Sequence, residues 1–283
     1  MTLAAAAAVL AAALAASGGS QAQPGTATPD EAGRLVPDVV AILPGTVHYD
    51  TRRSPRRGTR RLITFSGTTV NNGAGPLIVR TERGNLGFGT LSARQVVKRT
   101  DGRRVLAGSP LRLRYVTAGG HSHFHLQDFM RYELRTVDGR RVRGDRKQGF
   151  CLGDRFDNTG PTRLPAEPAS AVFRGRCGLG RPRLRNLTMG ISVGFGDDYP
   201  AGLEGQFIDI TGLPSGRYVL VFRADPGRRL LDQHRDNDVS SMLLRIEGGA
   251  RTAVRILSWC PSTDSCTVPG RHRRAAPAWR IRG

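Results

Sequence analysis

Three histidines stand at alternate positions in the stretch Gly119–His125. His121, His123 and His125 are each separated by one other residue. On a β-strand, side chains two residues apart point to the same face. Three neutral imidazole nitrogens that converge on one point can bind copper, zinc or iron and leave a coordination position open for water or oxygen. The spacing predicts a metal site but leaves the metal open. The alternatives are a solvent-exposed histidine turn or core histidines that hydrogen-bond to the backbone.

Lys147 is one of only two lysines among the 43 lysine and arginine residues of the chain. A guanidinium stays protonated in proteins, whereas a lysine amine with a lowered pKa can add to a carbonyl or a quinone. The other lysine, Lys98, stands in a polar turn, and we expect it to be solvated. This comparison makes Lys147 a candidate nucleophile.

Short β-strands are the elements that must position these residues. Apolar, β-branched runs bounded by Gly, Asn, Asp or Pro recur along the chain, and no stretch beyond residue 22 has helical periodicity. The clearest runs are 62–65, 77–79, 111–116, 218–222 and 242–246. Repeated short strands with turn signals predict an all-β, β-sandwich-like single domain, which we place at residues 35–268.

Residues 146–196 differ in composition, being rich in Gly, Pro and Arg with few alternating apolar residues. They predict a long loop region, and such loops in compact domains either carry function or are disordered. The chain has four cysteines, which allow three pairings. We favour Cys151 with Cys177 and Cys260 with Cys266, because each bridge then closes one loop.

The first 22 residues predict a secretory signal peptide. Ala4–Ala16 is an almost unbroken run of Ala, Leu and Val, too short to span a bilayer but suited to the apolar core of a signal; a low-complexity alanine tract is the alternative. Residues 23–34 predict a disordered linker and residues 269–283 a basic tail. No later stretch is apolar for long enough to span a membrane. We therefore expect a secreted protein, extracellular or in the cell envelope, with its cysteines paired.

The formal net charge of +20 raises the question of a polyanionic partner. The densest arginine runs, 52–61 and 271–282, contain no interleaved aromatic residues and no nucleic-acid motif. We therefore expect no nucleic-acid partner. The runs predict solvated surface, with an anionic cell-envelope polymer as the alternative partner.

Several motifs together resemble the lysyl oxidase family. Lys147–Asp154 is similar to the segment in which a lysine stands four residues before the cysteine of a Phe-Cys-Leu-x-Asp motif, and Gly190–Tyr199 with Gln206–Thr211 is similar to the motif that follows. Shorter matches are Leu35–Asp38, Pro214–Leu220 and Asp236–Val239, so the resemblance covers about residues 35–247. The order of the three histidines, the lysine and the tyrosine along the chain is more specific to the family than any single motif.

The resemblance implies a bacterial lysyl oxidase-like copper amine oxidase, of the protein-lysine 6-oxidase type. His121, His123 and His125 would be the copper ligands, and Lys147 and Tyr199 would be joined as lysine tyrosylquinone, a cofactor made from the chain itself. Such an enzyme oxidises a primary amine to an aldehyde with oxygen and releases hydrogen peroxide and ammonia. The substrate stays open among peptidyl lysine, polyamines and small amines.

The reaction also needs a base, and a carboxylate close to the quinone suits that role. Asp197, two residues before Tyr199, is our first candidate and Asp198 the second; either can instead be a surface acid or a partner of a histidine. Compared with the animal enzymes, Gly120, Ser122 and Phe195 replace a tryptophan and two cysteines. We therefore expect the copper ligands to be kept and the animal disulfide pattern to be absent.

Two other classes of protein account for parts of the pattern. A secreted copper-binding β-domain without a redox cofactor would keep the histidines but have no use for Lys147 and Tyr199. A cell-envelope polymer-binding module would depend on the arginine runs and tolerate loss of the histidines. A cross-link between Lys147 and Tyr199 is expected of the oxidase alone.

Overall fold

The computed structural model describes residues 28–55, 58–85, 87–117, 122–145, 149–203, 205–248 and 253–270. His121 and Lys147 lie outside these ranges, as do the predicted signal peptide and the tail beyond residue 270. Of the predicted linker, residues 28–34 are described, and they contain a turn at Glu31–Ala32 and the start of the first strand at Arg34.

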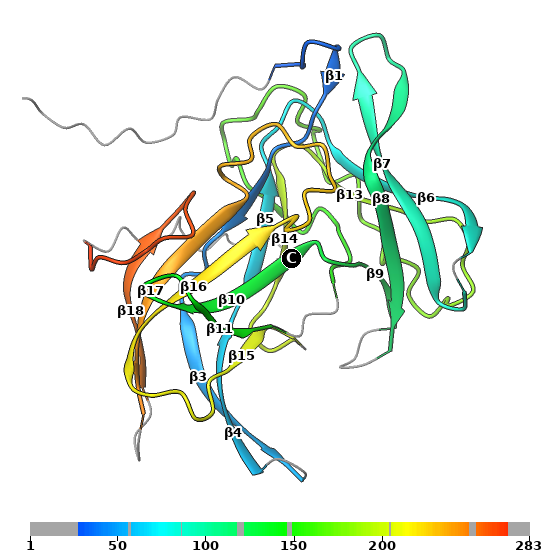
Figure 1. Cartoon of the computed structure of the whole chain (residues 1–283). Helices are drawn as coiled ribbons and strands as arrows, with labels where there is room; N and C mark the ends of the chain where they lie inside the picture. Colours follow the sequence, from blue (N-terminus) through cyan, green and yellow to red (C-terminus); the bar gives the residue numbers. More distant parts are fainter. Residues whose placement is uncertain are drawn as a thin grey trace, which may run out of the picture.

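The first sheet carries the histidine motif and contains six strands in the described chain. Its order is β13–β6–β7–β8–β9, with β1 paired to β7, and all its pairs are antiparallel. The strands are β1 (Arg34–Leu35), β6 (Leu77–Asn85), β7 (Thr90–Arg99), β8 (Arg104–Val116), β9 (His123–Leu126) and β13 (Thr188–Ile191). Strands β6, β7 and β8 lie on the right of Figure 1.

The second sheet is more deeply buried than the first. The sequences of its central strands are near-continuous apolar runs, which is typical of strands that are covered on both faces. Its order is β11–β10–β16–β17–β18. The strands are β10 (Met130–Thr136), β11 (Arg141–Gly144), β16 (Gly216–Ala224), β17 (Val239–Glu247) and β18 (Ala253–Cys260). In Figure 1 they lie on the left, away from β6, β7 and β8.

Two smaller sheets complete the described strands, in the orders β12–β14–β5–β2 and β15–β4–β3. The first contains β2 (Val39–Ile42), β5 (Gly67–Asn71), β12 (Phe156–Asp157) and β14 (Phe195–Tyr199), and the second contains β3 (Val47–Ser54), β4 (Gly58–Phe65) and β15 (Phe207–Asp209). The described residues of the arginine run 52–61 lie at the paired ends of β3 and β4, where Arg52 and Arg53 are exposed.

One apolar core draws side chains from all four sheets. At its centre, the rings of Phe65, Tyr132 and Phe222 pack edge-to-face, with centroids 4.9 to 5.3 Å apart. Aromatic side chains of this size contribute much of the free energy of burial. The core therefore joins the sheets into one packed unit.

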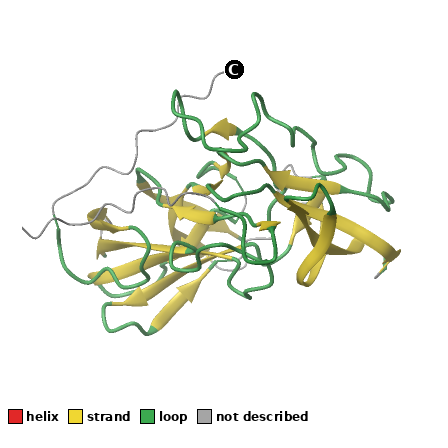
Figure 2. Ribbon diagram, turned by 90° about the horizontal axis from the view of Figure 1, so that it is seen from above, coloured by secondary structure: helices red, strands yellow, loops and turns green. Residues whose placement is uncertain are grey.

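The prediction of an all-β, disulfide-stapled fold is confirmed. Figure 2 shows strands and loops, and no helix occurs among the described residues. Consequently none of them forms a helix able to cross a membrane. Both predicted bridges are present, Cys151–Cys177 and Cys260–Cys266. The first closes a separation of 26 residues, which in the chain-entropy account stabilises the fold by about 3 to 4 kcal/mol.

Candidate metal and cofactor site

Strand β9 carries two of the three predicted metal ligands. His123 and His125 project from the same face of the strand, and their Nε2 atoms lie 2.8 Å apart. His125 is buried and His123 is half-buried. The third predicted ligand, His121, lies outside the described residues, and within the described part no group of three His, Cys, Asp or Glu side chains is arranged to hold a metal.

The spacing of the two imidazoles fits a shared metal ion. When two nitrogens bind the same ion at about 2.0 to 2.1 Å and the N–metal–N angle is roughly a right angle, the nitrogens lie about 2.9 Å from each other. The observed 2.8 Å matches this value. The donor set is also suitable, because neutral imidazoles are good ligands for copper, zinc and iron.

Strand β9 is held along both edges. One edge pairs with β8, where His125 lies opposite Arg114. On the other edge, Leu126 and Phe150 exchange backbone hydrogen bonds of 2.7 and 3.0 Å, and the Phe124 N–H donates to the Cys177 carbonyl at 2.8 Å. The Cys151–Cys177 bridge links the two segments on this second edge. The strand is thus fixed before any metal binds.

Tyr199, the last residue of β14, is brought beside the histidines. Its ring centroid lies 6.4 Å from that of His125 and 4.5 Å from that of Phe150. Its Oη accepts the Cys151 N–H at 2.5 Å. Phe150 and Cys151 follow Lys147 in the sequence by three and four residues. Two predicted parts of the site, the tyrosine and the histidine pair, are therefore neighbours.

The environment of Tyr199 disfavours its phenolate. Burial raises the pKa of the phenol well above its ordinary value, and the carboxylate of Asp197 raises it further. The Cys151 N–H and Arg155 act in the opposite direction without cancelling the rise. The phenol is thus protonated at physiological pH, and its ionisation requires additional positive charge nearby, of the kind that a metal ion supplies.

Asp197 lies two residues before Tyr199 on β14, so the two side chains project to the same face of the strand. It is almost completely buried, and the Arg155 Nε lies 3.5 Å from its Oδ1. Asp198 projects to the other face and is half-buried. Burial raises the pKa of Asp198, and Arg155 partly offsets that rise. Of the two predicted base candidates, Asp197 is the one on the face of Tyr199.

Asp154 is a residue whose role the sequence reasoning missed. Its buried carboxylate accepts the N–H groups of Val172, Phe173 and Ser192 at 2.7 to 2.9 Å, and also the Ser192 hydroxyl at 2.8 Å. It therefore ties together distant parts of the segment 149–196, which we predict as part of one long loop but which contains β12, β13 and the start of β14. The available signal was its place at the end of the Phe-Cys-Leu-x-Asp motif.

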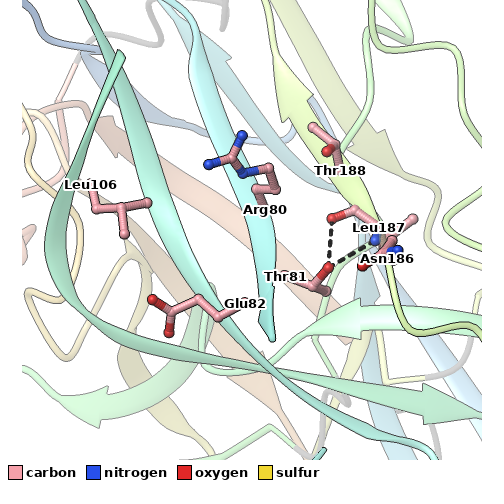
Figure 3. A pocket seen from close by; sticks show the side chains of 7 residues that line it. All are labelled: Arg80, Thr81, Glu82, Leu106, Asn186, Leu187 and Thr188. Atoms are coloured by element: carbon pink, nitrogen blue, oxygen red, sulfur yellow. Dashed lines mark hydrogen bonds between the residues drawn. The ribbon is translucent and has the colours of Figure 1, made fainter. Parts of the chain in front are cut away.

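An open pocket of about 680 Å³ lies away from this site (Figure 3). It is lined by Arg80, Thr81 and Glu82 of β6, by Leu106 of β8, and by residues 186–188, which lead into β13. Thr81 and Leu187 are joined at its edge by hydrogen bonds of 2.9 and 3.3 Å. None of the predicted site residues lines it, so we assign it no part in the chemistry of the site.

Comparisons with known proteins point to one family. A family model described as lysyl oxidase matches residues 178–255, a stretch that includes Asp197 and Tyr199 but leaves out His121, His123 and His125. Lysyl oxidase homolog 2 of Xenopus tropicalis is 24% identical over 198 residues, which cover 70% of this chain and 20% of that protein.

Two further relatives have similar names. Lysyl oxidase homolog 1 of Homo sapiens is 30% identical over 121 residues, or 42% of this chain and 18% of that protein. Protein-lysine 6-oxidase of Rattus norvegicus is 30% identical over 130 residues, or 45% of this chain and 28% of that protein. The chain spans less than a third of the length of each of these relatives.

Proposed function

Because this chain belongs to the lysyl oxidase family, we propose that it is an amine oxidase that depends on copper and on a quinone made from its own side chains. In this proposal His121, His123 and His125 hold the copper, and Lys147 and Tyr199 form lysine tyrosylquinone. The substrate is a primary amine, such as peptidyl lysine, a polyamine or a small amine. The products are an aldehyde, hydrogen peroxide and ammonia.

One observation carries the proposal: the Tyr199 ring lies beside His125 and also contacts Phe150 and Cys151 in the segment that follows Lys147. A cofactor built from a lysine and a tyrosine beside a metal needs these three parts together. A copper carrier gains nothing from this arrangement. Nor does a polymer-binding module.

When formed, the quinone supplies an electrophilic carbonyl for the amine, and oxygen takes up the two electrons of the oxidation. The chain's own residues supply the rest. Asp197 accepts the proton removed from the carbon next to the amine, because it is buried on the face of Tyr199. Arg155, 3.5 Å away, positions that carboxylate. The burial of Tyr199 and His125 limits the access of water.

We also propose that residues 1–22 direct export and that residues 35–268 form the catalytic domain. Two disulfide bridges support an oxidising compartment outside the cytosol. The domain borders and the signal peptide stay predictions.

The test is peptide mapping by mass spectrometry after maturation of the full chain with copper and oxygen. We expect the peptides that contain Lys147 and Tyr199 to be recovered as one cross-linked species carrying the quinone mass change. In Lys147→Arg the cross-link and the amine-dependent release of peroxide are both lost, while copper still binds. An Arg variant that still oxidises amines would refute the cofactor assignment, and copper binding without any cross-link would favour the copper-binding β-domain.

A further inference from the structure

A basic groove of about 690 Å³ lies on the same sheet as the histidine pair. Its lining includes three arginines, Arg112 and Arg114 on β8 and Arg229 on the loop between β16 and β17, against a single carboxylate, Asp128. The formal charge of these four side chains is +2. We call this surface the arginine groove.

The arginine groove is continuous with the face that carries the histidines. Arg114 lies directly opposite His125 in the β8–β9 ladder, and residues paired in this way project to the same face of a sheet. One step further along, the Gln127 N–H donates to the Arg112 carbonyl at 3.0 Å, and Gln127 also lines the groove. The groove therefore begins about one residue pair away from the predicted metal ligands.

The backbone that presents the third arginine is fixed. The Arg229 N–H donates to Asp225 Oδ1 at 2.9 Å, and its carbonyl accepts the Ser109 N–H of β8 at 2.7 Å. Arg112 and Arg114 are exposed on a paired strand and project to the same side. The backbone of all three arginines is thus held by hydrogen bonds, and their guanidinium groups are available to carboxylates on one surface.

The rest of the lining favours a polypeptide over a uniformly anionic polymer. Asp128, whose Oδ2 lies 4.0 Å from Arg229 Nη1, repels a continuous run of phosphates but can accept a backbone N–H. Phe88 is 77% exposed at the groove and offers an apolar contact that a phosphate chain cannot use. Carboxylates at intervals along a peptide fit this mixed surface.

We propose that the arginine groove binds acidic side chains of a polypeptide and so presents a nearby lysine of that polypeptide to the histidine face. The proposal rests on the proposed amine oxidase function and names its substrate class: peptidyl lysine with acidic residues about two to four positions away, given the rise of about 3.3 Å per extended residue. It also explains how a chain of net charge +20 attracts a molecule that carries an ammonium group.

The test measures binding separately from oxidation. Two fluorescent peptides of equal length each carry one lysine, flanked about two and four residues away by glutamates in one peptide and by glutamines in the other. Their affinities are measured by fluorescence anisotropy on the full chain and on Lys147→Arg, which cannot form the proposed cofactor. We expect the acidic peptide to bind at least about tenfold more tightly to both proteins, with a preference that shrinks at high salt.

The decisive variant replaces Arg112, Arg114 and Arg229 together by glutamine. Its matched control replaces Arg217, Arg245 and Arg255, three exposed arginines that form a cross-strand row in the other large sheet. Thermal unfolding of both variants verifies that they fold. We expect the groove variant to bind the two peptides within about twofold of each other and the control to keep the preference.

Three outcomes would overturn the proposal. The first is equal binding of both peptides by the unaltered chain, and the second is an unchanged preference in the groove variant. In the third, polyphosphate binds through the groove arginines while the acidic peptide does not, which would identify a phosphate-rich polymer as the occupant. Peptide binding is measured without any oxidation of the peptide. Absence of peroxide release would therefore refute the proposed oxidase activity but would not affect the result of the binding measurement.

Discussion

Tyr199 is the residue at which the separate parts of the site meet. It contacts Phe150, lies beside His125 and accepts a hydrogen bond from Cys151. The histidines and cysteines could be singled out from the sequence because their type and spacing are unusual. Tyr199 and Asp197 could be singled out only through family resemblance, since a lone tyrosine or aspartate has no spacing to recognise. Asp154 was missed because its partners are mostly backbone N–H groups of segments far away in the chain.

We expect Asp197→Asn to lower turnover without preventing formation of the cofactor. An amide cannot accept the proton, so amine-dependent peroxide release should fall by about 10²- to 10⁴-fold. The Lys147–Tyr199 cross-link should still form, because the asparagine side chain keeps the shape of the aspartate that it replaces. Both are measured on the same preparation, by a peroxide assay and by peptide mapping.

Asp198→Asn is the matched control, because Asp198 lies on the same strand but projects to the other face. Its turnover should stay within about threefold of that of the unaltered chain. If Asp198→Asn is the variant that loses turnover, the assignment of the base passes to Asp198.

Strand β9 is only four residues long, yet it presents His123 and His125, the two described histidines of the predicted metal motif. The strands themselves were predictable, because short apolar runs between turn residues mark them one by one. The neighbours on the outer edge of β9 were not predictable, because they come from the segments around Phe150 and Cys177, far from β9 in the chain. The pairing of β14 with β5, which fixes Tyr199 opposite Gly67, is equally invisible to a local pattern.

Gly149 makes the contact on this edge possible. Its φ is +97°, and a Cβ at this position would lie 2.3 Å from the Leu126 carbonyl oxygen. We expect Gly149→Ala to push this segment away from β9, to lower the free energy of unfolding by roughly 2 to 4 kcal/mol and to abolish most of the cross-link. Urea unfolding and peptide mapping measure the two effects.

Gly160→Ala is a suitable control, because Gly160 also has a positive φ, +62°, but nothing lies within 4 Å of its Cβ position. It should cost only about 1 kcal/mol and leave the cross-link intact. Equal effects of the two substitutions on the cross-link would show that the close approach to β9 is unimportant.

The molecule as a whole combines a strong positive charge with one buried group of carboxylates. Asp38, Asp225 and Asp238 are buried around the start of β2 and the loop before β17, with Asp232 nearby and Arg235 paired to Asp225 and Asp238 at 2.9 and 3.0 Å. Composition predicted the net charge but not this group, because its members come from separate parts of the chain. Their mutual repulsion makes stability depend on pH.

Burial raises the pKa of Asp232 to about 8, with the neighbouring Asp238 adding to the rise, and burial raises the pKa of Asp238 to about 6. Between the ordinary aspartate pKa of 3.8 and about 8, the folded protein therefore holds these protons more tightly than the unfolded chain does. The free energy of unfolding consequently falls as the pH rises through this window, by roughly 2 to 4 kcal/mol from about pH 5 to about pH 8. Urea unfolding at several pH values measures it.

The buffer for this measurement contains no divalent cations, because a cation among the carboxylates would offset their repulsion. Asp232→Asn should flatten the pH dependence and stabilise the protein most at about pH 8. The exposed Asp157→Asn serves as the control and should keep the full slope. A slope that survives in Asp232→Asn would place its origin elsewhere.

The bridge between Cys151 and Cys177 gives the molecule an order of maturation. Both sulfurs belong to segments that border the outer edge of β9. In the reduced chain these two segments are no longer linked to each other at that edge. We expect this disulfide to form before the metal binds. The protein then becomes active only after it has reached an oxidising environment.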